Sequence, residues 1–205
     1  RFRRDNGPHH RNPTEVFMQT QTTYPRLHRL IHWGLALTMM VMLLTVLLRL
    51  GWMEKNHMAA IIHQGLAKID VIITDKQAVS IAKGIRGVMF QWHIYFGYAV
   101  GVFVFARFVY MAKFGLHYPS PFSRQATTKQ KFQAWVYWVF YAGVALSVIT
   151  GLLLKFGPEA IEQQAETIHK LALWYLIPFI SLHLAGILVA ESGNDKGIVS
   201  KMIGG

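Results

Sequence analysis

The chain has 205 residues, of which 53% are hydrophobic, and it carries a formal net charge of +11. This composition is too apolar for an ordinary soluble domain, and the length allows several membrane-spanning helices. With no cysteine in the sequence, disulfides, thiolate-ligated iron–sulfur clusters and covalently attached c-type haem are excluded. The basic residues flank hydrophobic windows and form no groove-reading helix, so we do not expect nucleic-acid binding.

Apolar windows define the expected elements in chain order. Four windows predict transmembrane helices, because each contains at least sixteen consecutive residues without Asp, Glu, Lys or Arg: 30–50, 88–112, 132–154 and 171–190. We therefore expect three parts: a polar basic N-terminal segment (1–29), one four-helix transmembrane domain (30–190) and a cytoplasmic tail (191–205).

The long connection 51–87 carries an apolar pattern of its own. Its apolar residues recur at helical spacing between Met58 and Ile73, with charged residues between them. This predicts an amphipathic helix that lies on the outer leaflet, under a partner protein, or over the spans of the protein itself. The expected fold class is thus an all-α integral membrane protein, a four-transmembrane-helix bundle with an amphipathic helix in the first outer loop.

Charge flanking the windows predicts orientation. The segments on the N-terminal side of the membrane hold thirteen Lys and Arg and four acids, against eight and six on the opposite side, for net charges of +9 and +2. The positive-inside rule then places both termini in the cytoplasm.

Two histidines of the last predicted span carry the strongest functional signal, one just before its apolar window and one inside it. His169 and His183 are fourteen residues apart. In one continuous helix that spacing returns the second side chain to nearly the same face, roughly 21 Å further along the axis. Ionisable residues at such depth are costly and usually functional. A bis-histidine haem needs an imidazole on each side of its iron, so such a helix could give one ligand to each of two haems.

Two other windows offer the remaining imidazoles. His93 opens the second window, and Gly97 one turn later leaves room for a flat macrocycle. At the start of the first predicted span either His28 or His32, one turn apart, could ligate; we favour His32, which is deeper and precedes Trp33. With the predicted topology, His32 and His183 share the cytoplasmic half and His93 and His169 share the outer half. Zinc is the rival metal, but it would want its ligands clustered at one depth.

Arginines near the window ends are candidates for neutralising haem propionates, because the guanidinium fork binds carboxylates in bidentate fashion. The candidates are Arg26, Arg29, Arg86 and Arg107. Snorkelling to lipid phosphate is an equally good explanation of each one taken singly.

These residues resemble a bacterial di-haem cytochrome b family, the cytochrome b561 superfamily that includes membrane subunits of nickel–iron hydrogenases and respiratory formate dehydrogenases. The resemblance rests on four motifs in this order: Arg29-Leu30-Ile31-His32-Trp33, His93-x-x-x-Gly97, Phe105-Ala106-Arg107-Phe108 and the His169 to His183 spacing. The tail from Glu191 to Ile203 looks more like the hydrogenase type.

The resemblance implies two haem b groups, a quinone pool partner and an external iron–sulfur or multihaem redox subunit. Lys129-Gln130-Lys131 is similar to the formate-type element near the inner quinone site, although Thr127 stands where that element has Asn and Leu173 stands where the family often has Gly. The resemblance thus implies quinone contacts from Gln130, Lys131 and His183.

The function expected from these observations is a transmembrane electron-transfer subunit, without a catalytic residue of its own, inside a hetero-oligomeric quinone-linked complex such as a hydrogenase. One alternative is a stand-alone cytochrome b that oxidises a small donor such as superoxide. Another is a histidine-lined metal transporter, which would need polar residues along its path, and the middle of the four windows offers few.

Overall fold

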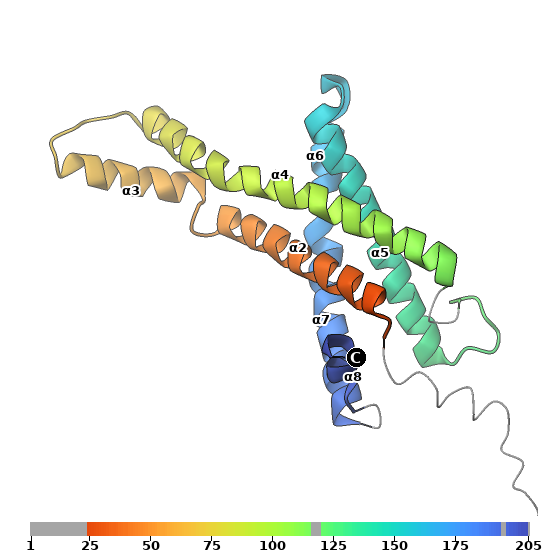
Figure 1. The fold of residues 1–205 in the computed structure, drawn as a ribbon. Helices are drawn as coiled ribbons and strands as arrows, with labels where there is room; N and C mark the ends of the chain where they lie inside the picture. The colour runs from red at the N-terminus through yellow and green to blue at the C-terminus, as the bar shows by residue number, and fades with distance from the viewer. Residues whose placement is uncertain (1–23, 116–119, 194–195, 205) are drawn as a thin grey trace, which may run out of the picture.

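The computed structural model describes residues 24–115, 120–193 and 196–204, and within them every element is a helix (Figure 1). The helices are α2 (Arg26–Leu50), α3 (Lys55–Ala67), α4 (Asp75–Phe114), α5 (Thr128–Phe156), the short η1 (Glu159–Ile161), α6 (Glu162–Lys170), α7 (Ala172–Ser192) and α8 (Ile198–Ile203). Four segments are long and apolar enough to cross a membrane: α2, α4, α5 and Glu159–Ser192. The predicted all-α, four-span fold is confirmed. The N-terminal segment predicted for 1–29 lies outside the described residues as far as residue 23.

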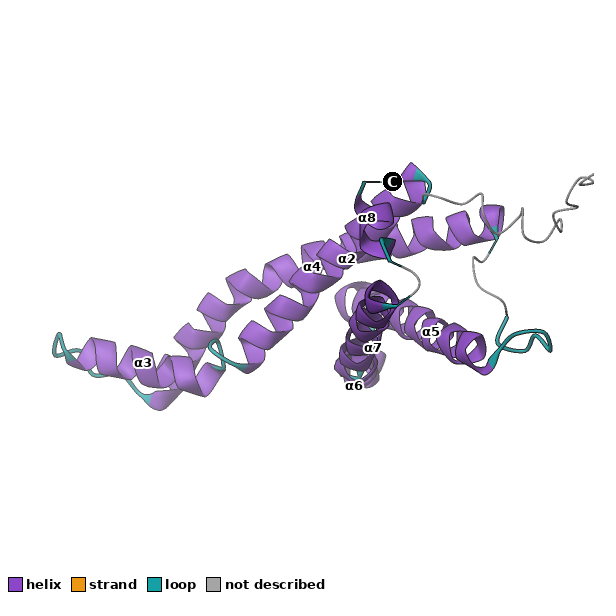
Figure 2. Cartoon of the chain, turned by 90° about the horizontal axis from the view of Figure 1, so that it is seen from below, coloured by secondary structure: helices purple, strands orange, loops and turns teal. Residues whose placement is uncertain are grey.

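The spans form two antiparallel pairs that cross each other. In the first pair, α2 lies along α4, with Thr45 beside His93 near one end and His28 beside Arg107 near the other. In the second pair, α5 lies along α6 and α7. Figures 1 and 2 show the α2–α4 pair running across the α5–α7 pair at a large angle. Each pair therefore meets the other over a limited stretch near its middle.

The core fills that crossing. Its buried residues come from all four long helices: Leu35, Val100, Val104, Phe140, Val144 and Leu176. Two glycines let side chains of neighbouring helices approach closely. The ring of Phe103 on α4 lies against Gly34 on α2, and a Cβ added at Gly143 on α5 would lie 2.9 Å from the ring of Tyr175 on α7.

The amphipathic segment ends earlier than its apolar pattern predicted. The pattern continued to Ile73, but α3 stops at Ala67, so the expectation of one helix over that whole stretch was wrong. Asp70 takes a left-handed backbone conformation (φ 56°), and the Val71 N–H donates to the Leu66 carbonyl, which closes the helix. A capping box between Thr74 and Gln77 then starts α4.

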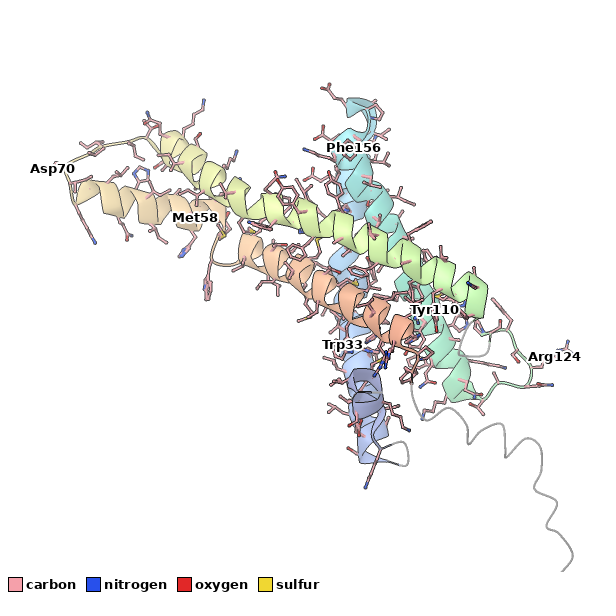
Figure 3. All side chains as sticks on the ribbon, in the orientation of Figure 1. Trp33, Met58, Asp70, Tyr110, Arg124 and Phe156 are labelled. Atoms are coloured by element: carbon pink, nitrogen blue, oxygen red, sulfur yellow. The ribbon has the colours of Figure 1, made fainter. Side chains whose placement is uncertain are left out.

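Helix α3 packs on the first turns of α4. Ala59 of α3 meets Ala78 and Ala82 of α4, and all three are buried. A helix of forty residues is about 60 Å long, roughly twice the hydrocarbon thickness of a bilayer. The α3–α4 hairpin, with Asp70 at its tip in Figure 3, therefore projects beyond one end of α2.

The last span is broken next to His169. Residues 169 and 183 were expected on one continuous helix, but α6 ends at Lys170 and α7 begins at Ala172. The N–H of Leu171 donates to the carbonyl of Ile168, three residues back, so the chain tightens there. Both histidines nevertheless lie against the α2–α4 pair, His169 beside His93 and His183 beside His32.

The C-terminal segment folds back onto the start of α2. The Glu191 carboxylate accepts hydrogen bonds from the N–H groups of Gly197 and Val199. Trp33 donates its indole N–H to the carbonyl of Met202 at 3.0 Å, and Arg29 donates to that of Ile203 at 3.2 Å. Figure 3 shows Trp33 next to α8. Helix α8 is thus fixed over the end of the bundle that holds His32.

We predict that Gly34→Leu lowers the stability of the bundle, whereas Gly186→Leu on α7 does not. A side chain at Gly34 would collide with the Phe103 ring, while nothing lies within 4 Å of a Cβ at Gly186. Overpacking of this kind costs about 1–3 kcal/mol. The measurement is the melting temperature of each variant in detergent, and an equal drop in both would contradict the α2–α4 packing described above.

Candidate functional site

Four of the histidines form two pairs across the crossing helices. Each histidine is half-buried, and each pair joins one side chain from the α2–α4 pair to one from the α6–α7 segment. The pairs lie on opposite sides of the core. Leu176 falls between His169 and His183 in the last span, and Leu35 falls between His32 and Thr45, the neighbour of His93, on α2. The sequence argument from depth predicted this pairing, and the structure brings the same residues together.

His93 and His169 form the first pair. Their ring centroids are 6.3 Å apart and the ring planes are 82° apart. The His93 ring stacks on Phe90, with centroids 4.7 Å apart and planes 7° apart. A Cβ at Gly151 would lie 3.2 Å from Cε1 of His169, so this glycine gives the ring its place against α5.

Each ring of this pair also has a threonine partner. Nδ1 of His93 lies 2.8 Å from Oγ1 of Thr45 on α2, and Nδ1 of His169 lies 3.1 Å from Oγ1 of Thr150 on α5. With each Nδ1 engaged, Nε2 is the nitrogen that each ring can offer to a metal. Neither threonine was identified from the sequence, because an isolated Thr in an apolar window carries no signal without knowledge of which helices are neighbours.

His32 and His183 form the second pair, with ring centroids 6.1 Å apart and ring planes 50° apart. His183 stacks on Phe179 at 5.6 Å, and Phe179 in turn stacks on Phe140 at 3.7 Å. Trp33 packs edge-on against His32. Each histidine of this pair thus has an aromatic neighbour, Phe179 on the side of the core and Trp33 on the side of α8.

His28, the alternative to His32, has a different neighbour. It is buried, and Nη1 of Arg107 donates to its Nδ1 at 2.9 Å. Nε of Arg107 also donates to the hydroxyl of Tyr141 at 3.0 Å. The structure therefore places His32, not His28, beside His183.

Both pairs have the chemistry and spacing of a bis-imidazole metal site. An imidazole nitrogen bonds a first-row metal at about 2.0–2.1 Å, so two such bonds in line put the ring centres roughly 6 Å apart. The measured separations of 6.1 and 6.3 Å agree with this. Among the described residues no three His, Cys, Asp or Glu side chains gather as a tetrahedral site would need. The residues present thus fit two haem groups, one at each pair.

Of the four arginines predicted to face haem propionates, Arg107 and Arg29 already bind protein groups at the His32 end of the bundle. Arg26 is exposed at the start of α2, and Arg86 lies about two turns before His93 on α4. These four roles stay predictions. The sequence argument overlooked Arg49, whose guanidinium lies 4.5 Å from the centroid of the Phe90 ring. Arg49 lies one helical turn after Thr45, the residue that contacts His93, so its guanidinium lies near the His93/His169 pair.

The structure shows no contact that joins Gln130, Lys131 and His183, the residues expected to contact quinone. Gln130 is exposed in the first turn of α5, where its carboxamide oxygen accepts hydrogen bonds from the N–H and the hydroxyl of Thr127. Lys131 follows it, half-buried. Thr127 and Gln130 form the capping box that starts α5. This local structural role is enough to explain why both residues are present. A quinone role for Gln130, Lys131 and His183 stays a prediction.

Comparison with known proteins agrees with this geometry. The family model described as prokaryotic cytochrome b561 matches residues 23–205, which include both histidine pairs and all four spans. Neither the curated proteins nor the solved structures gave a match. The chain therefore belongs to the prokaryotic cytochrome b561 family, and this membership makes it a multi-pass bacterial membrane protein that transfers electrons with haem b.

Proposed function

We propose that the chain is the di-haem membrane subunit of a larger oxidoreductase and carries electrons between an external redox subunit and the membrane quinone pool. The observation that carries the proposal is the presence of two histidine pairs, both with the spacing of a bis-imidazole site, on opposite sides of one apolar core. One site could serve only one side of the membrane, whereas two sites in series can link both.

The residues of the chain would do two things. His93 with His169, and His32 with His183, would each hold one haem b. Haem b bound in this way supplies one-electron redox chemistry at its iron. The apolar core residues between the two pairs would keep water away from both sites. Limited access of water is one of the factors that set the potential of a redox site.

The two ends of the bundle suit different partners. At the His93 end, the α3–α4 hairpin extends beyond α2. It would offer protein surface outside the bilayer, because α4 is about twice as long as the hydrocarbon layer is thick. On the positive-inside orientation this end faces outward, where an external redox subunit would dock. The His32 end would then face the cytoplasmic leaflet, where His183, Gln130 and Lys131 are the candidates for contact with quinone.

The apolar layer between the pairs also separates this proposal from a metal transporter. A permeation path would need polar groups from one pair to the other, but the crossing is filled by Leu35, Val144, Leu176 and their apolar neighbours. The two pairs are thus better explained as two separate cofactor sites than as successive binding sites along a permeation path for a metal ion.

The first prediction concerns haem content. Purified, fully loaded protein should carry two non-covalent haem b groups per chain, both six-coordinate and low-spin, because each pair supplies both axial nitrogens. A pyridine haemochrome assay and the optical spectrum measure this. One haem or fewer per chain would contradict the two-site proposal.

The second prediction concerns the pairing of the ligands. His93→Ala and His169→Ala should each remove the same haem, while His32→Ala and His183→Ala should each remove the other, since each haem loses one of its two axial ligands. Redox titration with haem quantitation identifies the haem that remains. His28→Ala, which leaves both pairs intact, is the matched control and should keep both haems.

The pairing would be wrong if His93→Ala and His183→Ala abolished the same haem. It would also be wrong if His28→Ala removed one haem while His32→Ala removed none.

The third prediction concerns orientation. Net charges of +9 and +2 on the two sides favour cytoplasmic termini. A reporter that is active only in the cytoplasm should be active when fused after Gly205, and a periplasmic reporter fused there should be silent. The opposite pattern would exchange the sides assigned to the redox partner and to quinone.

A further inference from the structure

The two histidine pairs differ in their hydrogen bonding. In the part of the chain that the structure describes, both rings of the His93/His169 pair are hydrogen-bonded to threonines, whereas neither ring nitrogen of His32 or His183 has a hydrogen-bond partner. Thr45 is 5% exposed and Thr150 is 3% exposed, and they are two of four buried polar residues in the described chain. Buried threonine hydroxyls thus contact both rings of the His93/His169 pair and neither ring of the His32/His183 pair, and this difference needs an explanation.

The direction of each bond follows from counting protons. Oγ1 of Thr45 donates to the carbonyl of Met42 at 2.7 Å, and Oγ1 of Thr150 donates to that of Leu146 at 2.8 Å. A hydroxyl has a single proton. With that proton on the carbonyl, the threonine oxygen can only accept from the ring, so Nδ1 of His93 and of His169 carries the hydrogen. The lone pair of each ring then lies on Nε2.

This tautomer is the one that leaves Nε2 of both rings ready to bind a metal. A hydrogen bond from the far nitrogen of a ligating imidazole fixes ring orientation and makes the ligand more basic. The hydroxyl that accepts it is itself polarised by donating to a carbonyl, which strengthens its acceptor character. A more basic axial ligand stabilises the ferric state over the ferrous state, and so lowers the midpoint potential.

We infer that Thr45 and Thr150 are positioning residues which hold His93 and His169 in the ligating tautomer and lower the midpoint potential of the haem at that pair relative to the haem at His32 and His183. The inference rests on the proposed ligands. It gives the two sites different potentials by means of the protein alone. Electrons arriving at the His93 end would then pass toward the His32 end, from the lower to the higher midpoint potential.

The test replaces each hydroxyl by a methyl of the same shape. In Thr45→Val, Thr150→Val and the double variant we expect the midpoint potential of the haem at the His93 pair to rise while the other stays unchanged. The double variant should shift the electron-sharing equilibrium between the haems about tenfold, or about 59 mV for a one-electron couple. Its low-spin electron paramagnetic resonance signal should broaden as ring orientation loosens. Thr45→Ser, which keeps the oxygen, should restore the original potential.

Thr38→Val is the matched control. Thr38 is also buried on α2, and its hydroxyl also donates to helix carbonyls, those of Gly34 and Leu35, but it has no histidine partner in the described structure. A purely structural role would make Thr38→Val, Thr45→Val and Thr150→Val equivalent, with lower stability and no shift in potential. That result would overturn the inference.

Two readouts keep failure of the inference apart from failure of the proposed function. Two haems per chain with unshifted potentials in both valine variants would contradict only the threonine roles. Wild-type protein with fewer than two haems would contradict the function itself. If Thr45→Val does not assemble, Thr150→Val on the other helix pair decides the same question.

Discussion

The crossing of two antiparallel helix pairs is the constraint from which both sites follow. Each pair alone presents histidines on one face, and no single helix can hold two imidazoles on opposite sides of an iron. Because the α2–α4 pair runs across the α5–α7 pair, His32 meets His183 and His93 meets His169. The crossing depends on close contacts at its centre. The ring of Phe103 packs against Gly34, and the ring of Tyr175 packs against Gly143. The core is thus a spacer as well as a source of stability.

Fully buried polar side chains are few in the described part of the chain, and each of them has a definite hydrogen-bond partner. Membrane-embedded hydroxyls usually donate to a carbonyl one turn earlier, as Thr38, Thr45 and Thr150 do. At two of these positions the same oxygen also reaches a histidine. At the His32 end the polar contact goes elsewhere, from Arg107 to His28 and Tyr141. The two ends of the bundle are therefore chemically unlike, although their histidine pairs have nearly equal spacing.

The fold class and the approach of His32 to His183 and of His93 to His169 could be predicted from the sequence, because both depend on periodic and depth patterns. Haem ligation by these residues stays a prediction. Spans follow from long apolar windows, and histidines at matched depths follow from the alternating direction of four helices. The break between α6 and α7 could not be predicted, since Leu171 is an ordinary helix former and the tightening there is a matter of local hydrogen bonds. The early end of α3 depended on a left-handed Asp70, which an apolar pattern does not reveal.

Contacts between helices that are distant in the sequence were also beyond sequence reasoning. Thr45, Thr150 and Arg49 gain their importance only from the neighbour that the crossing gives them. Gln130 shows the opposite case: it belongs to a motif similar to one near a quinone site, but a capping box already explains its position. Resemblance of a short motif and the local need to start a helix can produce the same residues.

The most direct test of the central claim is an experimental density map of the haem-loaded protein in a lipid environment. The claim is that each iron is held between two helix pairs, at two separate depths. We predict two planar features with strong central density, one bracketed by His32 and His183 and the other by His93 and His169. A single feature, or one bracketed by His28, would contradict it.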